Sequence, residues 1–193
     1  KNYIFFVCYL TVLIGFYFNE DTLGGAKTDY LFHIEFIELF HKDLIYGIKN
    51  YGYDDYIARN SPVFYIILSF LNKLLSLDLI RLFNTLTSLI LAIIFYKCLK
   101  LNFNFIKKEK LKILSCVVFL SPTVRSLSIW PYPLLWGLIF FLVSIFYFLK
   151  FLKLGDKKEK YFFLSILFLA ISSYLHINFS VFGIFFLFNY FKY

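Results

Sequence analysis

An aspartate and a histidine, Asp29 and His33, stand one helical turn apart in a segment whose apolar residues recur at helical spacing. A Gly-Gly pair interrupts the preceding structure, and Thr28 is the expected N-cap of a helix that runs to about Lys42. At about 100° per residue, Asp29 and His33 share one face of this helix with aromatic residues, opposite its charged residues. The aromatic residues are Phe36 and Phe40, and the charged ones are Glu35, Glu38 and Lys42.

An acid on that face would be shielded from water beside the body of the protein, where it can act as a general base on a sugar or other hydroxyl. The sequence therefore predicts Asp29 as the catalytic base, with His33 orienting it or contacting a substrate phosphate. The alternative is a simple Asp–His pair, or an acid that only complements the positive end of the helix dipole.

Five other ionisable residues complete the candidate site. Glu20 and Asp21 are candidate catalytic acids just after the first apolar run, or else solvated surface charges. Arg59 and Arg125 are two of only three arginines, and arginine recognises phosphate bidentately. The alternative is that both arginines extend toward lipid headgroups. His176, at an expected helix end, is a further candidate for substrate binding.

Metal binding has no support in the sequence. Cys8, Cys98 and Cys116 stand singly in apolar runs, without the spacing of a metal site. Carboxylates such as Asp29 are compatible with a divalent metal, but no ligand motif predicts one and no cofactor is assigned.

The elements that must position these residues have the composition of a membrane protein. Hydrophobic residues make up 61% of the 193 residues and charged residues 17%, and the mean hydropathy is +0.73. Soluble domains are nearer half apolar and a quarter charged, so a lone water-soluble globule, a disordered chain and a disulfide scaffold are excluded. The net charge of +8 does not indicate a nucleic-acid partner, because the lysines cluster between apolar runs.

Six apolar runs have the character of membrane spans, which need roughly 17 to 25 residues. We expect an all-α, polytopic membrane protein with spans at Tyr3–Phe18, Leu77–Leu99, Leu111–Leu120, Pro133–Leu152, Tyr161–Leu175 and Phe179–Tyr193. The run Pro62–Leu75 has only 14 residues and contains polar side chains, so an interfacial or re-entrant helix is expected there.

The distribution of charge predicts which loops face the cytoplasm. Lysines cluster in 97–112 and 150–160, and the positive-inside rule places such short loops inside. Residues 19–60 hold most of the acids and are expected to form the first outside loop, with the Asp29 helix lying beside the membrane. Residues 121–131 and 174–178 then also lie outside. The candidate site residues therefore gather on one face, and membrane lipid is an expected partner.

Three short motifs, through their order and spacing, resemble those of the GT-C superfamily of integral-membrane glycosyltransferases. They are Asp29-Tyr30-Leu31-Phe32-His33, Asn60-Ser61-Pro62-Val63-Phe64-Tyr65 and Arg81-Leu82-Phe83-Asn84. The nearest likeness is to the alpha-1,2-glucosyltransferase that completes the dolichol-linked oligosaccharide, and the protein mannosyltransferases share the general layout. The family's second acid is replaced here by Tyr30, and the first residue of its Pro-Pro pair by Ser61.

The resemblance implies a GT-C-like fold and an enzyme that transfers a sugar, with inversion, from a polyprenyl-phosphate donor to a hydroxyl of a glycan, lipid or protein acceptor. It also implies an essential acid in the first outside loop. Asp29 is the first candidate for this acid, and Glu20 and Asp21 are the second. Two alternatives stay open: a transporter or flippase of lipid-linked glycans, and a non-catalytic membrane subunit. Because the sequence has no methionine and stops inside an apolar run, we expect 1–193 to be one transmembrane domain, the N-terminal part of a longer protein.

Overall fold

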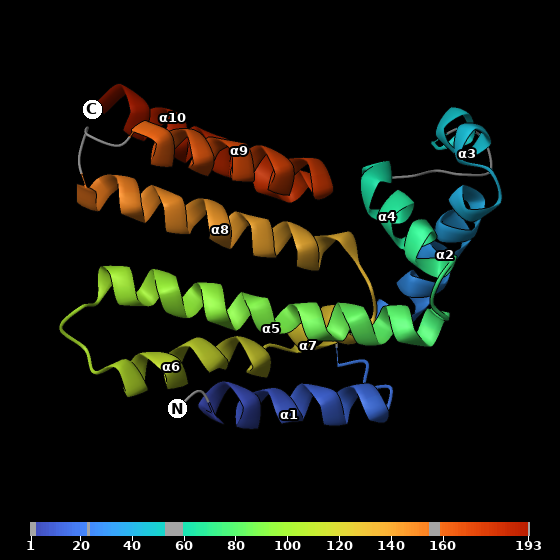
Figure 1. Ribbon diagram of the computed structural model, residues 1–193, viewed down its shortest axis with the longest axis horizontal. Coiled ribbons are helices and arrows are strands. Elements are labelled where there is room, and N and C mark those ends of the chain that lie inside the picture. Colours follow the sequence, from blue (N-terminus) through green and yellow to red (C-terminus); the bar gives the residue numbers. More distant parts are fainter. Residues whose placement is uncertain (1–2, 23, 53–59, 155–158, 193) are drawn as a thin grey trace.

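The computed structural model describes residues 3–22, 24–52, 60–154 and 159–192, which form helices and no strand. The helices, drawn in Figure 1, are α1 (Tyr3–Tyr17), α2 (Ala26–Lys42), α3 (Leu44–Asn50), α4 (Pro62–Asn72), α5 (Leu77–Asn102), α6 (Lys108–Cys116), η1 (Val117–Leu120), α7 (Pro122–Ile129), α8 (Pro133–Leu154), α9 (Glu159–Leu175), η3 (Ile177–Phe182) and α10 (Gly183–Lys192). The predicted all-α class is confirmed for these ranges.

Two helices, α5 and α8, are long and apolar enough to cross a membrane, with 26 and 22 residues. A third crossing results if α6 with η1 and α7 form one span, which bends by 72° at the break between them. The other expected spans correspond to shorter helices, of 15 residues in α1, 17 in α9 and 10 in α10. The described helices are therefore consistent with a membrane protein, in which two or three of them could cross by length and composition, and the six predicted spans stay a prediction.

Most of the helices run side by side, and a small layer covers one end of them. Figure 1 shows α1, α5, α6, α8 and α9 with similar directions, whereas α2, α3 and α4 lie across the end where α5 and α8 begin. Helix α8 packs between α5 and α9, and α2 packs on α4. Helix α4 has 11 residues, which is below spanning length and agrees with the expectation of a short helix in Pro62–Leu75.

Small residues bring α8 and α9 close together, as is typical of helices that pack in membranes. Ser172 Oγ donates a hydrogen bond of 2.7 Å to Gly137 O, and Ser144 Oγ donates one of 2.7 Å to Ser165 O. A Cβ on Gly137 would lie only 2.7 Å from the Phe179 ring, so any larger residue at 137 would push α8 and η3 apart.

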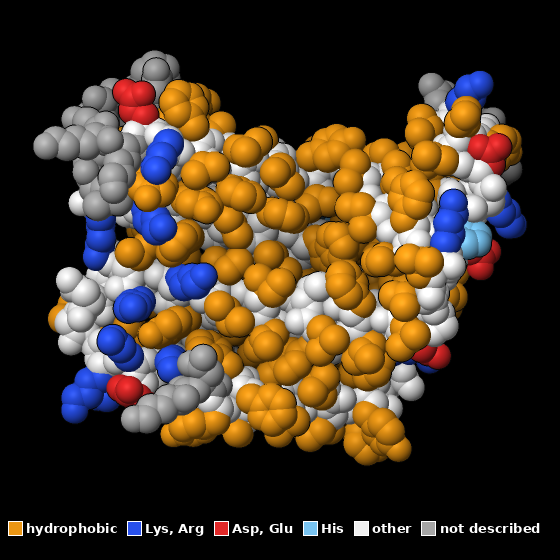
Figure 2. Space-filling model, in the orientation of Figure 1, with side chains coloured by type: hydrophobic (Ala, Val, Ile, Leu, Met, Phe, Trp, Pro, Cys, Tyr) orange, Lys and Arg blue, Asp and Glu red, His pale blue; other side chains and the backbone are white. Residues whose placement is uncertain are grey.

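Lysines are concentrated at one end of the bundle, although both ends carry acidic and basic side chains. Figure 2 shows a broad hydrophobic band across the middle and lysines concentrated at the end where α5 passes to α6 and α8 passes to α9. Acidic side chains and a histidine appear at the opposite end, near α2 to α4. The predicted inside loops therefore share one end of the structure, and the described part of the predicted first outside loop lies at the other.

Residues 121–131, which are expected outside, contain helix α7, and this helix packs against the bundle. Ser121 caps it by accepting from the Val124 N–H, and Ser126 and Ser128 are fully buried against the bundle. The reason is a set of polar partners contributed by α5, which the local sequence of this segment does not reveal.

Asn84 in α5 supplies most of these partners. Its Nδ2 donates to Leu127 O at 3.0 Å and to Ser128 O at 2.9 Å, and its Oδ1 accepts from Trp136 Nε1 at 3.0 Å. The neighbouring Thr85 Oγ1 also donates to Ser128 O, at 3.0 Å. Asn84 and Thr85 are completely buried, so these bonds join α5, α7 and α8 at one point.

We expect Asn84→Ala to lower the free energy of unfolding by about 1–3 kcal/mol, because it leaves a buried indole N–H and two carbonyls with fewer partners. Thermal unfolding in detergent micelles measures the loss. Asn102→Ala is the matched control, since Asn102 ends the same helix with an exposed side chain and should unfold like the unmodified protein. Equal stability of the two variants would contradict this role of Asn84.

Candidate functional site

Glu20 and Arg125, predicted as a catalytic acid and a phosphate-binding residue, bind each other. Arg125 Nε donates to Glu20 Oε1 at 2.7 Å, and Arg125 Nη2 contacts Glu20 Oε2, which makes the pair bidentate. Arg125 Nη2 also donates to Thr11 O, at 3.0 Å. The Arg125 guanidinium holds the pKa of the Glu20 carboxyl below its usual value. Both groups therefore act in this structure as a tie between the end of α1 and α7.

Gly15 is required for this tie. It is buried in α1, and a Cβ at this position would collide with the Glu20 carboxylate and lie 3.1 Å from Arg125 Nη2. No pattern in the sequence around Gly15 indicates this role, because its partner Arg125 is more than 100 residues away in the chain.

Asp21 has a structural partner as well. Its carboxylate accepts from the backbone N–H groups of Gly25, Ala26 and Lys27, at 3.0, 3.2 and 3.3 Å. These are N–H groups at the start of α2 that have no partner inside the helix. The helix therefore begins at Ala26 and is capped from Asp21, and the prediction of Thr28 as its N-cap is wrong.

Asp29 lies in the first turn of α2 with an exposed side chain, so the expectation that it is shielded from water is wrong. The buried face of α2 is formed by Ala26, Tyr30, His33, Ile37 and Phe40, and Asp29 stands at its edge. Within the described ranges its carboxylate has no hydrogen bond or ion pair. The opposite face of α2 is charged and exposed, as predicted.

His33 is the most buried of the predicted site residues, with 6% of its surface exposed. Its Nδ1 lies 2.8 Å from Tyr65 Oη, and its ring meets the edge of Tyr132 with the centroids 4.7 Å apart. Its Nε2 has no hydrogen-bond partner among the described residues. The ring of Tyr132 also contacts His176, at 6.1 Å between centroids, and His176 Nδ1 is likewise buried without a partner in the described part of the chain.

The structure therefore brings His33 and His176 together around Tyr132, although they are 143 positions apart in the sequence. Tyr51 packs on Tyr65, with the ring centroids 5.8 Å apart. We call His33, Tyr51, Tyr65, Tyr132 and His176 the histidine–tyrosine cluster. The sequence indicates the two histidines but not the tyrosines, because 16 tyrosines leave no single one conspicuous. The only available signal is that Tyr65 and Tyr132 each lie within three residues of a proline that starts a helix.

Hydrogen bonds within the cluster are compatible with a neutral His33 that carries its ring hydrogen on Nε2. Asn60 Nδ2 donates to Tyr65 Oη at 3.4 Å, so the hydroxyl hydrogen of Tyr65 is available for His33 Nδ1. With Tyr65 as the donor, Nε2 of a neutral His33 carries the ring hydrogen, and this nitrogen has no acceptor among the described residues. Burial lowers the pKa of His33 from 6.5 to about 4, so the ring is neutral at physiological pH. Burial also lowers the pKa of His176.

An apolar cavity of about 440 Å³ lies beside the cluster, between α4, α8 and α9. Val63, Ile67, Trp136, Phe140 and Leu175 are among the residues that line it, and Leu175 immediately precedes His176. The cavity and the cluster are thus joined through Leu175, whose side chain lines the cavity and packs with Tyr65 in one buried core.

The remaining predictions concern Arg59 and metal binding. Arg59 lies outside the described residues. The described ranges contain no group of three or more His, Cys, Asp or Glu side chains that could hold a metal ion. Comparisons of the chain with protein-family models, with curated proteins and with solved structures found no match.

The Glu20–Arg125 pair is expected to stabilise the fold, because its side chains are only 23% and 16% exposed. In a double-mutant cycle of Glu20→Gln and Arg125→Gln, thermal unfolding should give a coupling free energy of about 1–3 kcal/mol. Asp78→Asn is the control, since Asp78 pairs with Arg81 but its side chain is 86% exposed. A coupling near zero would show that the two charges act independently.

The lowered pKa of His33 predicts a loss of stability in weak acid. Protonation favours the unfolded chain, where the pKa is near 6.5, so stability is full above that pH and falls as the pH drops from 6.5 toward 4. The measurement is the free energy of unfolding at successive pH values. His33→Gln should make this free energy fall less steeply between pH 6.5 and 4, whereas the control His41→Gln, on the same helix, should leave the fall unchanged. An unchanged slope in the His33 variant would contradict the burial of a neutral imidazole.

Proposed function

We propose that the chain is part of a membrane glycosyltransferase of the GT-C type, with about six crossings, that uses a polyprenyl-phosphate sugar as donor and a hydroxyl as acceptor. The observation that carries the proposal is the position of Asp29, an unpartnered carboxylate one helical turn before the buried His33. Residues at i and i+4 of a helix are neighbours, roughly 5–6 Å apart between Cβ atoms. A base and a hydrogen-bond donor thus stand together at the end of the bundle.

The roles follow from the chemistry of each group. Asp29 accepts the proton of the acceptor hydroxyl, whose oxygen forms a bond to the anomeric carbon while the bond from that carbon to the phosphate oxygen breaks. The lipid phosphate leaves with additional negative charge, which a hydrogen-bond donor stabilises. Arg125 is engaged by Glu20, so the proposal gives this task to the Nε2–H of His33 and to His176. Glu20 and Asp21 stabilise the structure around them.

The apolar cavity beside the histidine–tyrosine cluster supports a lipid-linked donor. It lies against α8, one of the two helices that are long enough to span, and Leu175, next to His176 in the sequence, is one of its lining residues. A hydrocarbon chain in this cavity would place its phosphate toward the imidazole nitrogens. In the proposed orientation this end of the bundle faces the outside or lumen, and the lysine-rich end faces the cytoplasm.

The test is transfer of a radiolabelled sugar from a polyprenyl phosphate by the full-length protein in vesicles. We expect Asp29→Asn to lower the rate by at least about 100-fold, the usual contribution of a general base. Melting should be unchanged, since the carboxylate is exposed and has no partner in the described ranges. Glu35→Gln, on the opposite face of α2, is the matched control and should keep full activity.

Three outcomes would contradict the proposal. Undiminished transfer by the Asp29 variant would exclude it as the base. Movement of the lipid-linked sugar across the vesicle membrane without transfer would indicate a transporter or flippase. Neither transfer nor movement by the unmodified protein would indicate a non-catalytic subunit.

A further inference from the structure

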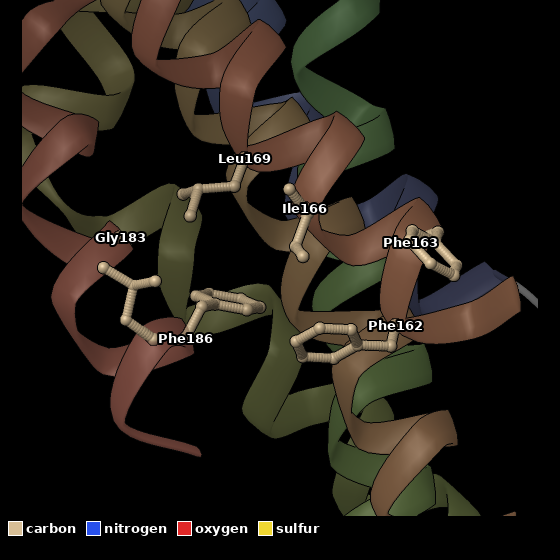
Figure 3. A pocket seen from close by; sticks show the side chains of 7 residues that line it. Phe162, Phe163, Ile166, Leu169, Gly183 and Phe186 are labelled. Atoms are coloured by element: carbon tan, nitrogen blue, oxygen red, sulfur yellow. The ribbon is translucent and has the colours of Figure 1, made fainter. Parts of the chain in front are cut away.

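An apolar cavity of about 450 Å³ lies between α9 and α10. Figure 3 shows Phe162, Ile166 and Leu169 of α9 and Phe186 of α10 pointing into the space between the two helices. None of its described lining residues has a polar side chain, so nothing in the cavity selects one ligand over another. Two unpaired polar groups that could recognise a ligand lie elsewhere, around Trp130 at the end of the bundle where α5 begins.

The first of these groups is the guanidinium of Arg81, near the start of α5, which is only 9% exposed. Its Nη1 donates to Asp78 Oδ1 at 3.3 Å, and its Nη2 donates to Asn19 Oδ1 at 2.8 Å. Its Nε is buried and has no partner among the residues that the structure describes. Nε and Nη2 form one edge of a guanidinium, whose N–H groups match the two oxygens of a carboxylate or phosphate. That edge of Arg81 is therefore half used, by the neutral oxygen of an amide.

The same edge of Arg125 shows what full use looks like. Its Nε and Nη2 bind the two carboxylate oxygens of Glu20. Arg81 has no such partner within the described ranges, since Asp78 contacts Nη1 and not this edge. The chain thus supplies a carboxylate to one of these two arginines and leaves the other with a place for an anion that carries two oxygens.

A second cation and a second unpaired group lie around the same indole. Arg81 Cζ lies 3.9 Å from the centroid of the Trp130 ring, and Lys27 Nζ lies 5.7 Å from it. The Tyr30 ring also packs on Trp130, and its hydroxyl is buried without a hydrogen-bond partner in the described part of the chain. Burial raises the pKa of Tyr30 to about 12, and the charge of Arg81 acts against this rise. The hydroxyl is therefore protonated, able to donate, and close enough to Arg81 to respond to its charge.

Two acids next to this site have other partners, and a third is in water. Glu20 is bound by Arg125, and Asp21 accepts from backbone N–H groups at the start of α2. The side chain of Asp78 is 86% exposed, so solvent screens its charge. Access to the half-used edge is through Asn19, which is exposed just after the end of α1. An anion that displaces the Asn19 amide reaches both Nη2 and Nε.

We propose that the Nε–Nη2 edge of Arg81, with the Tyr30 hydroxyl and the Lys27 ammonium near it, binds a phosphate group. A phosphate has two oxygens for the edge and others for the hydroxyl and the ammonium, whereas a carboxylate has only two oxygens in all. The phosphate is either a free ion or the phosphomonoester headgroup of a lipid. This is a second site at this end of the bundle, because the proposed function gives the donor phosphate to His33 and His176. Phosphate binding here does not depend on that activity.

The experiment measures binding of radiolabelled inorganic phosphate to the full chain in detergent micelles by equilibrium dialysis. We expect saturable binding that sulfate competes for and chloride does not. Arg81→Lys keeps the charge but removes the two-nitrogen edge, so it should weaken binding by at least about tenfold. Lys49→Gln is the control, since it removes an exposed positive charge from α3 at the same end of the bundle and should leave binding unchanged.

Two further variants separate binding from folding. Asn19→Gly removes the competing amide and suits a backbone with φ 52°, so it should strengthen binding by about threefold. A purely structural Arg81 would not give this gain. Tyr30→Phe removes a hydroxyl that has no partner among the described residues, so it should weaken binding by about threefold without lowering the melting temperature.

A lipid source is tested with the full chain in vesicles of phosphatidic acid and phosphatidylcholine, extracted in mild detergent. Preferential retention of phosphatidic acid in native mass spectrometry, lost in Arg81→Lys, would support the site with a lipid headgroup as its ligand. Saturable binding of inorganic phosphate would support it with the free ion. Binding of neither, or binding that is the same in Arg81→Lys, Asn19→Gly and the unmodified protein, would overturn the proposal.

Discussion

The carboxamide of Asn84 has to find every hydrogen-bond partner inside the protein, because it is completely buried in an apolar bundle. It finds them at the end of α7 and in α8, through Leu127, Ser128 and Trp136. These bonds determine how α5 and α8, the two helices long enough to span, are placed relative to the bent segment between them. The short connection from α7 to α8 is thereby held in a defined position.

That connection supports the layer formed by α2 to α4. The guanidinium of Arg81 lies over the Trp130 ring, with its Cζ 3.9 Å from the ring centroid. The Nε1 of Trp130 donates to Glu20 O at 3.0 Å, and its ring packs on Tyr30 of α2. Tyr132, two residues further on, stands between His33 and His176. The polar groups at this end thus fall into two sets. Most bind one another and hold the helices, whereas Asp29 and the two imidazoles keep unpaired atoms among the described residues.

Features that depend on a local run of residues are predictable from the sequence. The helical class, the apolar runs of α5 and α8, the charged face of α2 and the separation of lysines from acids all belong to this group. The exposure of Asp29 is not predictable in this way, because a helical projection gives the direction of a side chain and not the extent of the surface beside it. Trp130 and Ile129 cover Tyr30 and Ala26 but do not extend over Asp29. The Glu20–Arg125 pair joins residues 105 positions apart, and no local pattern encodes such a contact.

The long-range bonds of Asn84 also constrain how the chain is made. Its partners Leu127 and Ser128 lie 43 and 44 residues later in the sequence. At a synthesis rate of about 5–20 residues per second, roughly 2–9 s separate the translation of α5 from that of its partners. During this interval the amide of Asn84 has no hydrogen-bond partner from α7. Helix α5 is therefore expected to remain beside water or the insertion machinery, and to move fully into lipid only when α7 and α8 have emerged.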